Sequence, residues 1–316
     1  MTDFTLRQLQ YFVAAVETGS ITEAAERCHA SQGAASMAIT QLERAVGTEL
    51  LVRSGPRAAV ATPAGREFLV HARAILERME EAQDAVSESL TELRGIVRIG
   101  VGLTLSPRLV PQIAGHFTTH HPRVQVLLQE RPPRELEEQV LAGQLDVAFL
   151  YRLQTSTNLT VTDLAPVWLH VILPAGHRLA GESRVRLQDL TGEPAILLDV
   201  PPTKDRMLSL ARSLDVELDV RWTSSTMETI RSMVAAGLGF SFAQSLPATG
   251  TTYSGGAVVY RPLADEVAAN TIVALTLPGR IPRRVQAAID LVASSESGTS
   301  GESAESAGPG DPVRTG

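Results

Sequence analysis

The hydrophobic pattern of this 316-residue chain changes character at Gly95. Before Gly95, apolar residues recur at helical spacing, beginning with Leu6, Leu9 and Val13. After Gly95, strand-like runs alternate with helical runs, and this alternation favours parallel β-α-β units. The pattern therefore predicts an all-α N-terminal part followed by a longer α/β part.

Composition narrows the class of protein further. Hydrophobic residues make up 44% and charged residues 20%, which is ordinary for a soluble globular protein. We find no long apolar run that predicts a transmembrane helix, and residues 1–4 lack the features of a signal peptide, so we expect a cytoplasmic protein. The single cysteine, Cys28, excludes an intrachain disulfide framework, and the net charge of -7 argues against coating of nucleic acid by bulk charge.

Two short helices and a turn are predicted after a first helix over residues 6–18. Gly19 ends that first helix, and the pair Ser20 and Glu23 is typical of a capping box that starts the second. Ser31 is the expected cap of a third helix, which Gly47 ends. Helices joined by a turn of about three residues describe a helix-turn-helix, and residues 50–60 resemble a small hairpin, or wing. A small helical subdomain without a DNA role is the alternative that periodicity leaves open.

A long helix is predicted next, with Pro63 at its first position. If it reaches Leu90, it is about 42 Å long at 1.5 Å per residue. Its apolar residues alternate by four and three: Phe68, Ala72, Ile75, Met79, Ala82 and Val86. One stripe on so long a helix needs a partner, and a second copy of the chain is the simplest one. The alternative is that the stripe packs on the chain's own α/β part.

The α/β part is predicted in two sets. The first has strands over 96–101, 124–129 and 146–150, with helices over 107–119 and 134–142. The second has strands over 168–173, 195–198, 220–223 and 240–243, with helices over 203–213 and 225–236. Residues 258–261 are expected to return to the first lobe, which closes with a strand over 272–277 and a helix over 282–292. The stretch from Glu296 is rich in Ser, Gly and Glu, and is predicted to be a disordered tail.

The N-terminal sequence resembles that of LysR-type transcriptional regulators. The matching residues are Leu9, Phe12, Val16, Gly19-Ser20, Ala24-Ala25, Ser31-Gln32, Ser36, Ile39, Gln41-Leu42-Glu43, Gly47, Leu51, Arg53 and Thr62-Pro63-Ala64-Gly65. In the α/β part, residues 141–148 and 235–239 are also typical of the family. So many matches in register are far more specific than a lone helix-turn-helix, and the resemblance extends to about Ser294.

The resemblance implies a domain organisation. It consists of a winged helix-turn-helix at 1–61, a linker helix at 62–94, an effector domain at 95–295 and a tail at 296–316. The effector domain is expected to have two lobes of periplasmic-binding-protein type, about 95–165 with 268–295 and about 166–267, joined by two crossover strands. In this family the linker helix pairs two subunits, so Phe68, Ile75, Met79 and Val86 are the expected dimerisation residues. Assembly to a tetramer is expected, and RNA polymerase is a further candidate partner.

The resemblance also makes the third helix the recognition helix, which lies in the major groove of double-stranded DNA. Gln32 is then placed to read adenine, and Ser36 to reach a base or a phosphate. Arg53 and Arg57 on the wing are expected to contact phosphates. Ser31 is expected to cap the helix, and it could contact a phosphate as well.

The sequence departs from the family in this helix. Gly33 and Met37 stand where proline or serine and arginine are frequent, and residues 1–65 hold five arginines against six acidic residues. Non-specific attraction to phosphates should therefore be weak for each subunit. Met37 is either a contact to a thymine methyl group or an ordinary exposed apolar residue.

An effector site is predicted where helices begin beyond the carboxyl ends of strands. Three such starts are expected, with caps at Ser106, Thr203 and Ser225, and they favour an anionic effector if they face one cleft. The predicted effector residues are Gly102, Thr104, Ser106, Arg131, Thr203, Lys204, Ser225 and Thr226. For each hydroxyl residue, a capping role alone is the competing interpretation.

The predicted function is a DNA-binding transcription regulator controlled by a small molecule between two lobes, with no cofactor, metal or catalytic residue. The alternative is an enzyme or a solute-binding protein built on the same two-lobed fold. Some relatives sense oxidants through a pair of reactive cysteines in the effector domain, but this chain has no second cysteine. We expect Cys28 to be a small buried hydrophobic residue.

Overall fold

A computed structural model describes residues 4–53, 59–86, 93–152, 159–244, 246–247 and 249–305. Within it, residues 1–94 cluster with 138–145 as one compact unit, and residues 95–137 with those from Asp146 onward as another. Arg57, Leu90 and the end of the expected tail, 306–316, lie outside the described residues. The fold class predicted from the sequence is confirmed in both units.

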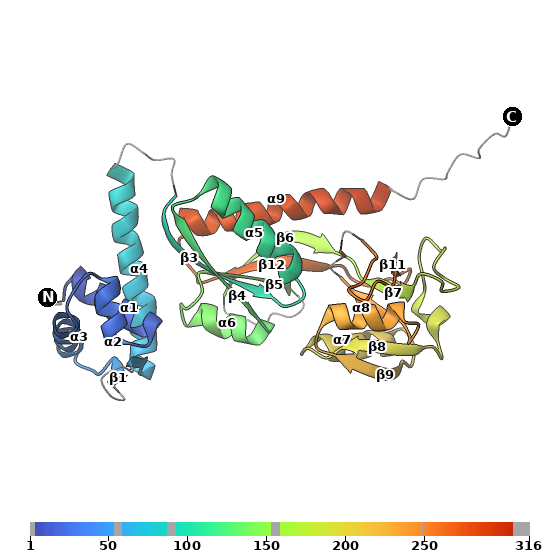
Figure 1. The fold of residues 1–316 in the computed structure, drawn as a ribbon, viewed down its shortest axis with the longest axis horizontal. Helices are drawn as coiled ribbons and strands as arrows, with labels where there is room; N and C mark the ends of the chain where they lie inside the picture. The colour runs from blue at the N-terminus through green and yellow to red at the C-terminus, as the bar shows by residue number, and fades with distance from the viewer. Residues whose placement is uncertain are drawn as a thin grey trace. The chain divides into compact units, whose positions relative to one another are not determined.

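The first unit is a helix-turn-helix with a short hairpin and a long helix (Figure 1). Its elements are α1 (Leu6–Thr18), α2 (Ile21–Arg27), α3 (Gln32–Val46), β1 (Leu51–Arg53), β2 (Ala59–Ala61) and α4 (Pro63–Val86). The predicted helix ends are confirmed, since Gly19 and Gly47 both adopt left-handed conformations at C-caps. A capping box at α1, formed by Thr5 and Gln8, was not predicted.

Close packing around small residues gives this unit its shape. Ala24 and Ala25 are buried where α2 meets α1 and α3, so the helices approach closely. Glu43 on α3 accepts hydrogen bonds from the amides of Leu50 and Leu51, at 3.0 and 3.1 Å, and so fixes the start of the hairpin. At the start of α4, a Cβ on Gly65 would lie 1.9 Å from the carbonyl oxygen of Leu50.

The first residues of the apolar stripe of α4 are buried within the helix's own unit, and later ones are exposed. Ala72 is fully buried in the core of the first unit, and the Phe68 ring packs edge-on to Phe4 and Phe12 with centroids 6.0 and 5.6 Å apart. Phe68 was predicted to pair subunits, but its ring packs inside its own unit. Further along, Ile75 is 39% exposed. The packing of the stripe on a partner stays a prediction, and it now concerns only the later residues of the stripe.

The second unit contains two lobes. The first lobe has a five-stranded sheet in the order β4-β3-β5-β12-β6. Its elements are β3 (Gly95–Gly102), α5 (Ser106–His120), β4 (Val124–Arg131), α6 (Pro133–Leu141), β5 (Val147–Tyr151), β6 (Thr160–Val167), β12 (Asn270–Thr276) and α9 (Arg283–Glu305). As predicted, β3 is parallel to β4 and β5; β12 runs antiparallel to β5 and β6. Helix α9 packs on β6 and α5 (Figure 1).

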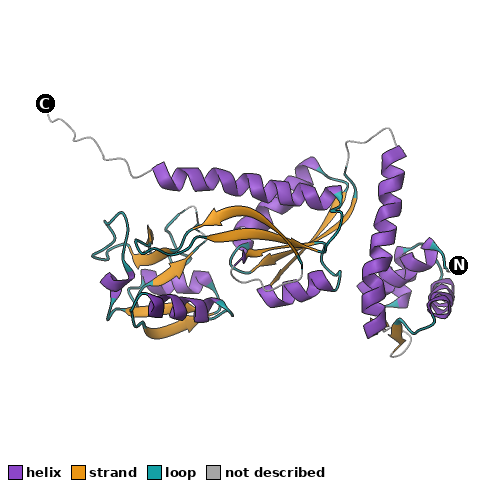
Figure 2. Ribbon diagram, turned by 180° about the vertical axis from the view of Figure 1, so that it is seen from behind, coloured by secondary structure: helices purple, strands orange, loops and turns teal. Residues whose placement is uncertain are grey.

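The second lobe lies between β6 and β12 in the chain. Its elements are β7 (His170–Pro174), the short 3-10 helix η2 (Leu187–Leu190), β8 (Pro194–Leu198), α7 (Thr203–Ser213), β9 (Asp219–Ser224), α8 (Met227–Ala235), β10 (Ser241–Ala243) and β11 (Val258–Pro262). Strands β10, β7 and β11 form one antiparallel sheet, and β8 with β9 forms a parallel pair. Figure 2 shows, from behind, the helices of this lobe lying against its strands.

Three expectations about the second unit are wrong. Strand β11 belongs to the second lobe, because it pairs with β7, and the chain returns to the first lobe only at β12. Strand β6 was missed; it pairs with β12, so the two crossings between lobes leave from neighbouring strands. The expected tail is helical as far as Glu305, and its first residue, Glu296, is buried and forms an ion pair with Arg108.

Candidate nucleic-acid interface and effector pocket

The start of α3 presents polar and small residues to solvent. The Ser31 hydroxyl accepts a hydrogen bond from the Ala34 amide at 3.2 Å, which confirms its capping role. Gln32 and Gly33 are exposed, and Ser36 one turn later is half-buried. The opposite face of the helix packs into the core through Ala35, Ile39 and Leu42. The four DNA-reading positions predicted on α3 therefore lie outside the core.

Met37 completes this surface. Its side chain is 61% exposed, which is unusual for a large apolar residue and leaves it available for contact. Gly33 has no packing reason to be glycine, since a Cβ there would meet nothing within 4 Å and its φ is not left-handed. The outer surface of α3 is thus small at Gly33 and apolar at Met37, the position where arginine is frequent in the family.

The hairpin lies next in the chain. Val52 and Val60 face each other across the β1–β2 pair, and both are exposed. Arg53 pairs with Ala59 through its backbone, which places it in β1 as predicted. Its side chain, like Arg57, lies outside what the structure describes, so the predicted phosphate contacts of both remain predictions.

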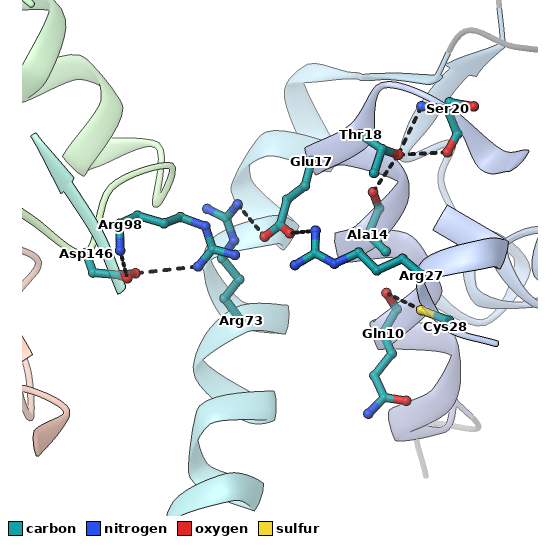
Figure 3. A network of polar contacts seen from close by, with 10 residues as sticks. All are labelled: Gln10, Ala14, Glu17, Thr18, Ser20, Arg27, Cys28, Arg73, Arg98 and Asp146. Carbon is teal, nitrogen blue, oxygen red and sulfur yellow. Dashed lines mark hydrogen bonds and ion pairs between the residues drawn. The ribbon is translucent and has the colours of Figure 1, made fainter. Parts of the chain in front are cut away.

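Glu17 on α1 joins the linker helix to the helix-turn-helix. Its carboxylate forms ion pairs with Arg27 of α2 at 2.7 Å and with Arg73 of α4 at 3.0 Å (Figure 3). The side chains of Glu17 and Arg73 are each only 11% exposed, so water screens this pair less than a surface pair. These ion pairs fix the direction of α4 relative to α1 and α2.

Cys28 sits beside the same cluster. It packs against the apolar core and its thiol lies 4.0 Å from the Gln10 carbonyl oxygen (Figure 3). Burial raises the pKa of the Cys28 thiol, against the lowering effect of Arg7 and Arg27. A raised pKa means less of the reactive thiolate at neutral pH, in agreement with the predicted structural role.

The second unit has a cavity between its lobes. It encloses about 570 Å³, counted with its opening to solvent. Its walls come from the loop after β3, the end of β5, the crossing at Leu169 and the strand ends and helices of the second lobe. The lining residues are Thr104, Tyr151, Leu169, Leu197, Leu198, Thr203, Met207, Met227, Ser241, Phe242, Ala243 and Gln244.

Two of the eight predicted effector residues, Thr104 and Thr203, line this cavity. Ser106 is buried and donates its hydroxyl back to the carbonyl oxygens of Gly102 and Leu103, so it is neither the cap of α5 nor a wall residue. Gly102, at the end of β3, is also absent from the lining. The sequence therefore located the loop after β3 correctly, but it did not show which side chains of that loop line the cavity.

The predicted cations lie elsewhere. Arg131 is half-exposed at the end of β4, 3.9 Å from Glu135, and Lys204 is paired with Asp199 at 3.2 Å. Neither Arg131 nor Lys204 lines the cavity. Among the described residues that line the cavity none is charged, so the predicted cations give no support for an anionic effector there.

The helix starts in the second lobe also differ from expectation. The N-cap of α7 is Pro202 and that of α8 is Thr226, neither with a side-chain cap, so Thr203 and Ser225 are not the caps. Ser225 and Thr226 lie outside the cavity lining. Glu228, in the first turn of α8, pairs with Arg231 and accepts a hydrogen bond from the Tyr253 amide.

Sequence reasoning missed three polar residues of the wall, Ser241, Tyr151 and Gln244. The last two lie at the carboxyl ends of strands, Tyr151 on β5 and Gln244 directly after β10. The rule that located Thr104 also applies to them, but we applied it only to helix starts. No group of three or more His, Cys, Asp or Glu residues is placed to hold a metal ion among the described residues.

Comparison with known proteins agrees with this arrangement. Residues 6–66 match the family "Bacterial regulatory helix-turn-helix protein, lysR family", and residues 91–296 match "LysR substrate binding domain". A hydrogen peroxide-inducible genes activator from Dickeya chrysanthemi is 29% identical over 87% of this chain and 90% of its own.

Solved structures show the same likeness. HinK, a LysR family transcriptional regulator from Pseudomonas aeruginosa, is 32% identical with a TM-score of 0.61, over 93% of this chain and 99% of its own. A full-length OxyR variant from the same species has a TM-score of 0.73 at 24% identity, over 92% and 98%, and supports the fold. No described helix is long and apolar enough to cross a membrane. With a DNA-binding and an effector-binding domain both matched along its length, this chain belongs to the LysR family of transcriptional regulators.

Proposed function

We propose that the chain reads its operator through Gln32, Gly33, Ser36 and Met37, and that a small molecule in the cavity between the lobes controls this activity. The observation that carries the proposal is the exposed, unpacked face of α3, which starts at a capped N-terminus. A helix N-terminus entering the major groove presents its first residues to base edges. Gln32 then suits adenine, and Met37 suits a thymine methyl group.

The proposal includes an oligomer. Ile75 is exposed, and Met79 is half-buried one turn further along the stripe of α4. The side chain of Val86 lies outside the described residues. A dimer through this stripe, and from it a tetramer, would place several recognition helices on one DNA molecule. That compensates for the absence of a net positive charge in residues 1–65 of each subunit, which hold five arginines against six acidic residues.

The mode of action follows from family membership and is also part of the proposal. We expect the protein to bind its effector without converting it, to act in the cytoplasm and to communicate with RNA polymerase. The peroxide-inducible relatives do not make this chain a thiol-based peroxide sensor. Its only cysteine is Cys28, in the DNA-binding unit, with a raised pKa.

A gel shift tests the proposal directly. Full-length protein is titrated onto a fragment of its own promoter and onto random DNA of equal length. We expect the promoter fragment to bind at least about a thousandfold more tightly. Equal affinity for both fragments would contradict sequence-specific recognition. Turnover of a metabolite panel by the same preparation would favour the enzyme alternative.

A further inference from the structure

The two lobes of the second unit are joined by a short first crossing. The backbone ladder of the first lobe ends where Val167, the last residue of β6, pairs with Asn270, the first residue of β12. The ladder of the second lobe begins at His170, the first residue of β7. Only Trp168 and Leu169 lie between these ladder ends on this crossing. We call these two residues the pivot, because a rotation of one lobe against the other must concentrate there.

The second crossing is longer, but it is held close to both ends. The Asp265 carboxylate accepts a hydrogen bond from the Leu187 amide of the second lobe at 2.8 Å. Residues 266–269 then separate this anchored position from β12, which begins at Asn270. Both crossings therefore pass from one lobe to the other over a few residues.

A side-chain hydrogen bond joins the lobes beside the pivot. The Asn270 amide nitrogen donates to the side-chain oxygen of Gln244 at 3.3 Å. Gln244 directly follows β10, whose last residue, Ala243, pairs with His170 in the second lobe. Asn270 belongs to the first lobe through its pairing with Val167. The bond therefore connects the lobes independently of the two backbone crossings.

The Asn270 end of this bond is held in place. Asn270 is only 4% exposed, and its side-chain oxygen accepts a hydrogen bond from the Thr271 amide at 2.8 Å. Because that oxygen is engaged, the group that faces Gln244 is the amide nitrogen, which can only donate. The first lobe thus presents a fixed donor to the second lobe, and the Gln244 oxygen is the matching acceptor.

The Gln244 end is held less firmly. Gln244 is half-buried, and a length of 3.3 Å exceeds the upper limit of roughly 3.2 Å that is usual for such bonds. A small rotation of the lobes is therefore enough to break the bond. Its presence distinguishes the lobe angle seen here from neighbouring angles.

The pivot and the second-lobe end of this bond also belong to the cavity wall. Leu169 of the pivot, Ala243 and Gln244 are all among the residues that line the cavity. A molecule in the cavity is therefore next to the part of the chain where the lobe angle is set. It can shift that angle only if it prefers one lobe arrangement over another.

We propose that the hydrogen bond between Gln244 and Asn270 is an inter-lobe latch: it favours the lobe arrangement described here and sets the free energy that an effector must supply to change it. This inference rests on the proposed role of the cavity and specifies how that site is regulated. The modest net contribution of one hydrogen bond corresponds to about a two- to tenfold change in the ratio of two arrangements. A latch of this strength can be overcome by the differential affinity of one small molecule.

Single-molecule energy transfer between a dye on each lobe measures this ratio. The dyes are attached to cysteines introduced by Thr118→Cys and Glu217→Cys, both at exposed positions, in a Cys28→Ser background. Labelled full-length protein is mixed with an excess of unlabelled protein, so that each oligomer carries one labelled subunit. Gln244→Met keeps the length of the side chain but removes the acceptor. We expect it to shift the ratio about two- to tenfold away from the arrangement that dominates in the wild type.

Two further variants separate the latch from a general disturbance of the lobe. Gln188→Met makes the same change at an exposed site of the second lobe outside the cavity wall, and it should leave the ratio unchanged. Gln244→Glu retains an oxygen acceptor, so it should keep the wild-type ratio or strengthen the dominant arrangement. Thermal melts verify that each variant is folded, and Gln244→Ala replaces Gln244→Met if methionine does not fit.

Two results would overturn the latch. One is a ratio that stays at the wild-type value in the variant without an acceptor. The other is an equal shift in Gln244→Met and Gln244→Glu, because the ratio would then not depend on the hydrogen bond.

The latch and the proposed function fail separately, since the dye measurement requires neither DNA nor effector. If wild-type protein does not prefer its promoter fragment, the proposed function fails whatever the lobe ratio does. If the promoter is preferred and Gln244→Met leaves the ratio unchanged, only the latch fails.

Discussion

The DNA-reading surface and the effector cavity recognise their partners in opposite ways. The start of α3 is open, with Gln32 and Gly33 exposed and Met37 protruding from the helix. The cavity opens to solvent, but apolar side chains dominate its described lining, and Tyr151 in its wall is almost fully buried. On an exposed polar surface, affinity depends on contacts that water competes for; in an apolar cavity, desolvation dominates. Similar substitutions should therefore have different consequences in the two places.

The largest expected effect lies between these two regions, on α4. Introducing Asp at both Ile75 and Met79 places like charges in the proposed pairing seam, where their desolvation is costly. We expect smaller oligomers in sedimentation and a loss of operator affinity of about a hundredfold or more, since joint binding by several subunits is lost. Ala74→Asp, exposed on the same helix but off the stripe, is the control. If the double variant forms oligomers of the wild-type size, the subunits pair through residues other than Ile75 and Met79.

On the DNA surface, Gln32→Ala should weaken binding to the cognate operator by about 1–3 kcal/mol, and binding to random DNA much less. Arg53→Ala should weaken both to the same extent if its side chain contacts phosphate. Competition gel shifts at one fixed salt concentration measure both ratios. Equal losses on the two DNAs for Gln32→Ala would remove its base-reading role and make the surface sequence-independent.

In the cavity, Thr104→Val removes a hydroxyl from the wall at nearly constant volume, and Thr226→Val does the same outside it. We expect the first to change the affinity of a bound probe by about 0.5–1.5 kcal/mol and the second to change nothing. DNA binding without ligand should stay intact in both. Thermal shifts with benzamide as a neutral probe and with a panel of carboxylates and phosphates provide the readout. A loss with Thr226→Val alone would show that the effector binds outside this cavity.

The smallest effect is expected at Gly33. Gly33→Ala fits without a clash and should stabilise the protein by roughly 0.5–1 kcal/mol, because alanine favours the helix. If DNA approaches the backbone here, operator affinity should nevertheless fall. Chemical denaturation and a gel shift on the same sample measure the two changes. If Gly33→Ala is more stable and binds the operator with unchanged affinity, DNA does not approach the backbone at this position.

Local signals predicted the DNA-binding unit well. Ser31, Gly19 and Gly47 act on the backbone next to them, so residue type and spacing sufficed to place the helix ends. The helix starts of the effector unit were harder to predict, because residue type alone did not show which neighbouring residue becomes the N-cap. Ser106 and Ser225 are of the capping type, but the N-caps of α5 and α8 are the neighbouring residues Leu105 and Thr226.

The sequence did not reveal which residues line the cavity. Tyr151 reads as the end of a buried strand, and nothing beside it in the chain indicates a cavity. Glu296 reads as part of a polar tail, and only its pairing with Arg108 reveals a buried residue. Both facts depend on residues far away in sequence, which a pattern of neighbours does not contain. The expectation of an anionic effector was drawn from caps, and the described wall residues give it no support.

The ion pairs of Glu17 have a mechanical consequence. Through Arg73, together with the buried Leu69 and Ala72, the first turns of α4 are bound to the helix-turn-helix and must move with it. Leu76 also packs against this core, so only the part of α4 beyond Leu76 can turn freely about a partner. If that part of α4 rotates, the helix-turn-helix moves with it as one rigid body. A signal delivered to the far end of α4 would then alter the spacing between recognition helices rather than the shape of either one.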